Sequence, residues 1–240
     1  YNTDDGSASV SSVTNSSYSA AAIKMYADTA DSSIRFYTAT AANTTPTERM
    51  RIDHDGSLST PTLGTSNVRF GVNAGNSIAS GGNYNVVVGD EAGTAITTGD
   101  YNVALGYRAL DTEDTGNKNV AVGANTFRSL NYNGDGFNTA VGHQAGYAVT
   151  TGTQNTLIGG LAGDAITTSN YTVAVGYNAA SSSTTGHSNS VLGRQALYSN
   201  TTGSNNTLIG TSAGLVSTGS DNTFMGAFAG DANIAGARNT

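Results

Sequence analysis

The sequence predicts an all-β protein: a β-solenoid, or β-roll, of about ten repeats of ~17 residues, preceded by a small N-terminal β unit. Three observations support this prediction. A glycine that follows a large apolar residue returns at a nearly constant spacing between Gly71 and Gly226. Short runs of β-prone residues lie between turn-forming Gly, Ser, Thr and Asn. No apolar stripe follows the i, i+3, i+4 spacing of a helix, and no proline occurs after Pro61.

The repeat is defined by these glycines, whose successive separations are 18, 17, 17, 19, 17, 17, 17, 17 and 16 residues. The copies are Asn67-Val-Arg-Phe-Gly71, Asn85-Val-Val-Val-Gly89, Asn102-Val-Ala-Leu-Gly106, Asn119-Val-Ala-Val-Gly123, Asn138-Thr-Ala-Val-Gly142, Asn155-Thr-Leu-Ile-Gly159, Thr172-Val-Ala-Val-Gly176, Asn189-Ser-Val-Leu-Gly193, Asn206-Thr-Leu-Ile-Gly210 and Asn222-Thr-Phe-Met-Gly226. An eleventh copy starts at Asn239. A unit this short buries its apolar residues only by stacking on its neighbours, about 4.8 Å apart.

Stacking in register places like residues in columns. The residue before each glycine is large and apolar, as in Leu105 and Val122, so we expect this column to form the dry interior. A small residue follows three positions after the glycine. Other strand residues are also small, and we expect them to allow close contact between chains: Ala104, Ala121, Ala140 and Ala174.

A second column consists of asparagines at the start of the copies. Stacked amides hydrogen-bond along an axis, so these side chains are predicted to form a structural ladder: Asn85, Asn102, Asn119, Asn138, Asn155, Asn189, Asn206 and Asn222.

The chain is expected to divide into residues 1–66, a lead-in and small β unit, and residues 67–240, the solenoid. The first part contains both prolines and no copy of the repeat. Its predicted strands are Ile23–Ala27, Ser33–Ala39 and Glu48–Asp53, followed by a turn at Asp55-Gly56, whereas residues 1–22 are predicted to be loosely ordered.

Composition excludes several classes. The chain has no cysteine, so it has no disulfide and no thiolate metal site. A net charge of −7 with only 10 Lys and Arg argues against nucleic-acid binding, and no apolar run is long enough for membrane insertion. We expect no catalytic residue, no enzymatic activity, no resident metal and no cofactor. The acidic clusters Asp90-Glu91 and Asp111–Asp114 are interpreted as charged corners, although a single Ca²⁺ at the second remains open. The three histidines are expected to be structural or solvated: His54, His143 and His187.

Aromatic side chains after the strands or in loops are the candidates for glycan or receptor contact, because flat rings suit sugar faces. They are Tyr132, Phe137, Tyr107, Tyr147, Tyr177 and Tyr198. Several recur at repeat-defined places, so packing between coils or chains is the competing interpretation. The insertion Asn131–Gly136 is irregular, which favours Tyr132 and Phe137.

Each coil offers few large apolar residues, which predicts association of identical chains. The stretch Gly193-Arg-Gln-Ala-Leu-Tyr-Ser-Asn-Thr-Thr-Gly-Ser-Asn-Asn-Thr-Leu-Ile-Gly210 resembles the repeats of phage tail-fibre proteins that end in an endosialidase-type intramolecular chaperone. Glu48-Arg-Met-Arg-Ile-Asp53 is similar to a β segment of such fibres. The Asn-x-x-apolar-Gly-x-x-Ala core also resembles the heads of trimeric autotransporter adhesins, which are left-handed β-rolls. The chain departs from the fibre pattern in lacking the chaperone segment, as expected if that segment is cleaved after trimerisation or if the sequence is a piece of a longer protein.

The resemblance covers about residues 48–240 and implies a homotrimer. It further implies a structural and host-recognition segment of a phage tail fibre, non-enzymatic, located on the virion tail fibre or an extracellular surface. Its partners would be itself and a host cell-surface glycan or protein. The alternatives are a trimeric bacterial surface adhesin and a glycan-depolymerising tailspike.

Overall fold

The computed structural model describes residues 7–10, 21–26, 33–38, 46–52, 58–60 and 64–240. The chain divides into two compact units, Tyr1–Thr62 and Leu63–Thr240, each of which is described by itself. The described residues are all-β, with no helix among them, which confirms the predicted fold class of a β-solenoid with a small N-terminal β unit.

The described part of the first unit is an antiparallel sheet of five strands in sequence order. The strands are β1 (Ser7–Val10), β2 (Ala21–Tyr26), β3 (Ser33–Thr38), β4 (Thr47–Ile52) and β5 (Leu58–Ser59). Of the start predicted to be loosely ordered, residues 1–22, the structure describes residues 7–10 and 21–22. Residues 7–10 form β1, which pairs antiparallel with β2 and places Val10 opposite Ile23, so the prediction is wrong there. Three predicted strand ends, the predicted turn and one histidine lie outside the described residues: Ala27, Ala39, Asp53, Asp55-Gly56 and His54.

Cross-strand pairing explains the alternation of apolar and charged residues in this sheet. Phe36 lies opposite Met50 on β4, and the neighbouring Arg35 lies opposite Arg51. Arg35 also contacts Glu48 at 3.3 Å, which offsets the like charges along this row. Alternate residues therefore separate into an apolar row and a charged row, as expected of a strand with two faces.

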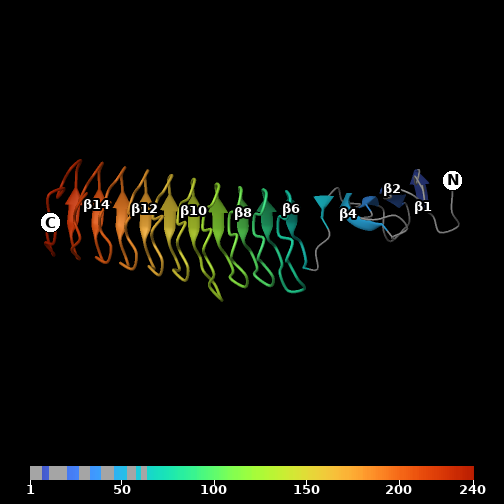
Figure 1. Cartoon of the computed structure of the whole chain (residues 1–240), viewed down its shortest axis with the longest axis horizontal. Coiled ribbons are helices and arrows are strands. Elements are labelled where there is room, and N and C mark those ends of the chain that lie inside the picture. Colours follow the sequence, from blue (N-terminus) through green and yellow to red (C-terminus); the bar gives the residue numbers. More distant parts are fainter. Residues whose placement is uncertain (1–6, 11–20, 27–32, 39–45, 53–57, 61–63) are drawn as a thin grey trace. The chain divides into compact units, whose positions relative to one another are not determined.

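The second unit is a parallel β-solenoid. Within residues 64–240, ten strands of three residues form one sheet in which each strand pairs in parallel with the next (Figure 1). The strands are β6 (Val68–Phe70), β7 (Val86–Val88), β8 (Val103–Leu105), β9 (Val120–Val122), β10 (Thr139–Val141), β11 (Thr156–Ile158), β12 (Val173–Val175), β13 (Ser190–Leu192), β14 (Thr207–Ile209) and β15 (Thr223–Met225). Equivalent positions pair throughout, as Ala104 does with Ala121, so the copies stack with no register shift.

The turns continue the pairing beyond the strands. Gly93 donates its N–H to the Ala109 carbonyl of the next coil at 2.8 Å, and Gly106 donates to Val88 of the previous one at 2.8 Å. The glycine after each strand is required by close approach, because a Cβ on Gly106 would lie 2.7 Å from the Gly123 carbonyl oxygen. Its φ of 130° also lies where side chains are rare.

The interior is lined by the middle residue of each strand, not by the residue before the glycine. Ala104, Ala121 and Leu157 are fully buried, whereas Leu105 is 42% exposed. The expectation that the column before the glycine forms the dry core is therefore wrong, and so is the expectation that the small strand residues contact other chains. Side chains alternate across a strand, so burying Ala104 turns Leu105 outward.

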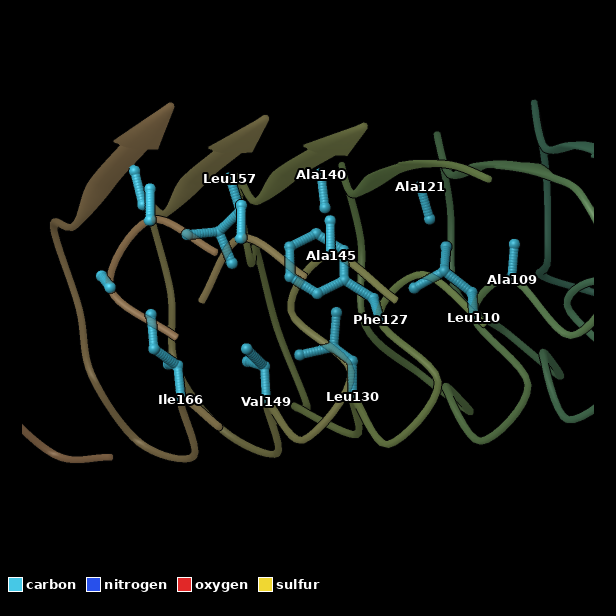
Figure 2. Close-up of a cluster of buried hydrophobic side chains, with 14 of the residues drawn as sticks. Ala109, Leu110, Ala121, Phe127, Leu130, Ala140, Ala145, Val149, Leu157 and Ile166 are labelled. Carbon is cyan, nitrogen blue, oxygen red and sulfur yellow. The ribbon is translucent and has the colours of Figure 1, made fainter. Parts of the chain in front are cut away.

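Three columns fill the core, as Figure 2 shows. Ala121, Ala140 and Leu157 project from the strands. Leu130, Val149 and Ile166 lie on the opposite side of the coil, seven residues after the glycine. Between them is the small residue three positions after each glycine, such as Ala145, and in some coils a large residue one position further on, such as Phe127. This thin interior positions every exposed turn residue on a rigid backbone.

Candidate functional surfaces

The asparagine column forms a buried hydrogen-bonded ladder. Asn102 Oδ1 accepts from the Asn119 backbone N–H at 3.0 Å, and Asn102 Nδ2 donates to the Gly116 carbonyl at 2.7 Å. The side-chain amide thus donates mainly to a backbone carbonyl of its own coil. Some asparagines also bond amide to amide, as Asn119 Nδ2 does to Asn102 Oδ1 at 3.3 Å. The same arrangement holds the other expected members, which are Asn85, Asn138, Asn155, Asn189, Asn206 and Asn222. These side chains are structural and unavailable to a ligand.

A second polar ladder, which sequence reasoning missed, lies two residues before the first. Asn83 N–H donates to Asp100 Oδ1 at 2.6 Å, and Asp100 N–H donates to Asn117 Oδ1 at 2.8 Å. Further along the rod, Asn170 N–H donates to His187 Nδ1 at 3.0 Å. The recurrence of Asn, Asp, His or Ser at this position was the available signal. His187 is therefore an acceptor within the scaffold.

The six predicted aromatic residues do not form one site. Tyr107 and Tyr177 occupy the position after the glycine and are 45% and 52% exposed. Tyr147 and Tyr198 stand five residues after it and are half-buried. Arg128 donates to the Tyr147 hydroxyl at 2.8 Å, which engages that ring in a contact between coils.

The insertion separates the remaining two. Tyr132 is half-buried and packs against the hydrophobic core, whereas Phe137 is 52% exposed. Lys118 Nζ lies 5.0 Å from the centroid of the Phe137 ring and forms an ion pair with Asp135 at 2.6 Å. Of the two rings favoured as contact candidates, Phe137 is therefore the exposed one, and Tyr132 packs on the core.

Three exposed tyrosines were missed. Tyr84, Tyr101 and Tyr171 precede the ladder position, have φ between 57° and 59°, and are 50–57% exposed. The Tyr84 and Tyr101 rings stack with centroids 4.9 Å apart. Phe137 occupies the same place in its coil. The residue before the asparagine is not aromatic in every copy, being Ser66, Lys118 and Gln154 in others, so the repeat pattern alone did not single out this column.

Each of the two acidic clusters contains a carboxylate that forms an ion pair with an arginine. Arg108 binds Glu91 and holds the pKa of that carboxyl below its usual value, chiefly by hydrogen bonding. Arg128 Nε lies 3.6 Å from Asp111 Oδ2. No group of three or more His, Cys, Asp or Glu side chains suited to a metal ion occurs among the described residues. The Ca²⁺ site left open at Asp111–Asp114 therefore gains no support.

Glu113 is the unusual acid of the solenoid. It is fully buried, in the column that contains Ile96 and Leu130 in the adjacent coils. Burial raises the pKa of its carboxyl, and hydrogen bonds from backbone N–H groups offset this only in part. Oε1 accepts from the Gly116 N–H at 2.8 Å, whereas Oε2 has no hydrogen-bond partner within the described residues. Such a carboxyl favours its neutral form.

Known proteins add no assignment to these surfaces. Across the described ranges there is no helix long and apolar enough to cross a membrane. Comparisons with protein-family models, curated proteins and solved structures find no match to the chain.

Proposed function

We propose that this chain is a structural and host-recognition segment of a phage tail fibre, non-enzymatic and homotrimeric, carried on the virion tail fibre or on an extracellular surface. The observation that supports this best is the uninterrupted stacking of ten strands in register in residues 64–240. Such a scaffold suits a rod that bears load and presents the same turn position again at each coil. The resemblance of its repeats to those of tail fibres supplies the biological setting.

Recognition in this proposal depends on rings held by rigid turns. Tyr107, Phe137 and Tyr177 are each about half exposed. An exposed ring face offers apolar contact to a sugar, and neighbouring amides and hydroxyls supply hydrogen bonds. One contact of this kind is weak, but several copies of the chain raise the effective concentration at a cell surface and so the avidity. The binding partner is accordingly a cell-surface glycan or a glycosylated receptor.

The two alternatives make different demands. A bacterial surface adhesin would use the same rod and the same exposed rings, and only its attachment to a cell would differ. A glycan-depolymerising tailspike needs two carboxyl groups free to act on the glycosidic bond. Arg108 engages Glu91 and Arg128 engages Asp111, which favours the non-catalytic assignment.

The test is binding of the fluorescently labelled chain to a panel of bacterial cells, before and after mild periodate oxidation of surface glycans or protease treatment. Binding that periodate abolishes and protease spares is expected for a glycan. Phe137→Ala and Tyr107→Ala should weaken it, whereas Asn76→Ala, a change at an exposed turn, should not. Absence of binding across the panel would contradict the recognition role. Release of reducing sugar from the cells would select the tailspike.

A further inference from the structure

The outer face of the parallel sheet is uncharged and largely apolar. The first and third residues of each strand point away from the core, and no charged side chain occupies any of these positions within residues 64–240. The third residue of every one of these strands is large and apolar, and many of these side chains are exposed to solvent. Leu192 is 50% exposed and Met225 70%. We call this surface, made of the first and third residues of β6–β15, the outer strand face.

A bare face of this kind is unusual in water. Parallel sheets are almost always covered on both sides, and extended apolar patches mark surfaces that bind something. The charges of the solenoid lie elsewhere. Arg108, Arg128 and Lys118 project from turns and pair with nearby carboxylates. The contrast indicates that the outer strand face contacts protein, while the turns contact solvent.

The outer strand face is long enough to form the central strip of a protein interface. Ten strands spaced by about 4.8 Å give a face roughly 45 Å long, and three residues at about 3.3 Å each give a width of about 10 Å. The exposed Tyr84 and Tyr107 columns border it and widen it. The strands alone give about 450 Å², somewhat more than half of the ~800 Å² that one partner contributes to a stable complex, and the bordering columns add to this area.

We propose that further copies of this chain cover the outer strand face, running parallel to it and in register. The columns repeat at the strand spacing, so a second copy presents a surface of the same period. Direction follows from composition. The first position is Val in β6 to β9 and changes to Thr or Ser in β10, β11, β13, β14 and β15. A parallel copy sets Val beside Val, whereas an antiparallel copy sets Val against Thr or Ser along much of the face.

This inference rests on the proposed function only for the expectation of several chains, and its test is independent of cell binding. The sequence contains no cysteine, so an introduced thiol is the only one present. Leu105→Cys lies on β8 and Leu192→Cys on β13, the third strand from each end of the face. Thr151→Cys, an exposed position in a turn, is the matched control.

Each purified variant is oxidised with diamide and analysed on a non-reducing gel. Leu105→Cys and Leu192→Cys should each give disulfide-linked dimers, and Thr151→Cys should not. In a refolded mixture of differently tagged Leu105→Cys and Leu192→Cys chains, disulfides should join only chains of the same kind. A mixed disulfide would overturn the parallel arrangement. Efficient linking through Thr151→Cys alone would overturn the assignment of the face.

Mass in solution gives the second measurement. The unmodified chain should be an oligomer by light scattering, and the double variant Leu105→Glu, Leu192→Glu should be a monomer with an unchanged circular-dichroism spectrum. The new carboxylates would stay hydrated in a single chain but would be buried between chains. A monomeric unmodified chain at tens of micromolar would overturn the inference. An oligomer that binds no cell would leave the inference standing and remove the recognition role instead.

Discussion

Leu157 and Gly163 share one volume of the core: a Cβ on Gly163 would lie 2.9 Å from Leu157 Cδ2. Other coils reverse this arrangement. Where the strand residue is the small Ala121, the residue four positions after the glycine is Phe127, fully buried with φ of 48°. In these coils one large side chain occupies the space, either from the strand or from the turn. In the coil of Ala140 and Gly146, where both residues are small, Phe127 of the preceding coil reaches the space, since a Cβ on Gly146 would lie 2.7 Å from Phe127 Cδ1. This size exchange keeps the interior filled although the individual positions vary.

The exchange predicts compensation between the two positions. Gly163→Ala should lower the free energy of unfolding by about 1–3 kcal/mol, because the methyl group collides with Ile166 and Leu157 and φ is +57°. Leu157→Ala should cost about 2–5 kcal/mol through a cavity. The double variant Leu157→Ala, Gly163→Leu should recover much of the loss, since Leu110 already adopts φ of 50° at the equivalent place.

Denaturant unfolding at one fixed protein concentration checks this, because association couples stability to concentration. Gly160→Ala is the control, since its Cβ would meet only Tyr177 at an ordinary 3.5 Å. Strictly additive losses in the double variant would contradict the shared volume.

Interrupting the asparagine ladder should destabilise the rod without affecting its surface. Asn102→Leu removes the acceptor of the Asn119 N–H and the donor to the Gly116 carbonyl. A buried polar group left without a partner costs about 1–3 kcal/mol. Asn76→Ala, at an exposed position, should change the free energy of unfolding by less than about 0.5 kcal/mol. Similar losses from both substitutions would show that the ladder contributes little.

Glu113 should make stability depend on pH in one direction. Burial raises its folded pKa above the unfolded value of about 4.3. The stability that the protonated Glu113 contributes is present in full below the unfolded pKa and is lost as pH rises through the folded pKa. The free energy of unfolding then falls by at most about 1.4 kcal/mol per pH unit.

Glu113→Gln keeps the shape but cannot ionise. The free energy of unfolding of this variant, minus that of the unmodified chain, should therefore increase with pH. The difference separates Glu113 from Asp164, whose pKa is also raised by burial. Asp90→Asn, an exposed change, is the control. A difference independent of pH would contradict the buried neutral carboxyl.

The two rings of the insertion should respond oppositely in stability and recognition. Tyr132→Ala should lower the free energy of unfolding by about 1–2 kcal/mol, because the ring packs on the core. Phe137→Ala should leave thermal unfolding nearly unchanged, since the ring is 52% exposed and loses mainly the contact with Lys118. Thermal melts of both variants, together with their cell binding, separate packing from surface contact. A large loss of stability in Phe137→Ala would remove it from the candidate binding set.

Several of the exposed aromatic side chains could be located from the sequence, but which of them lie together on one surface could not. The turn position of Tyr107 and Tyr177 followed from the period, and both rings are exposed. Tyr132 looked equally free because it lies in an irregular insertion, yet an enlarged coil needs a side chain to cover its interior. Tyr84 and Tyr101 were missed because the residue before a ladder asparagine has no pattern of its own until coils are stacked.

The sequence alone determined the period, the parallel stacking and the asparagine column, because a unit of ~17 residues with so few apolar side chains folds only against copies of itself. It did not determine which side of the strand faces inward. Ala104 and Leu105 are both apolar, and a shift of one residue exchanges the two faces of a strand. The tertiary structure decided this through the turns, which close around Ala104 and leave Leu105 on the outer strand face.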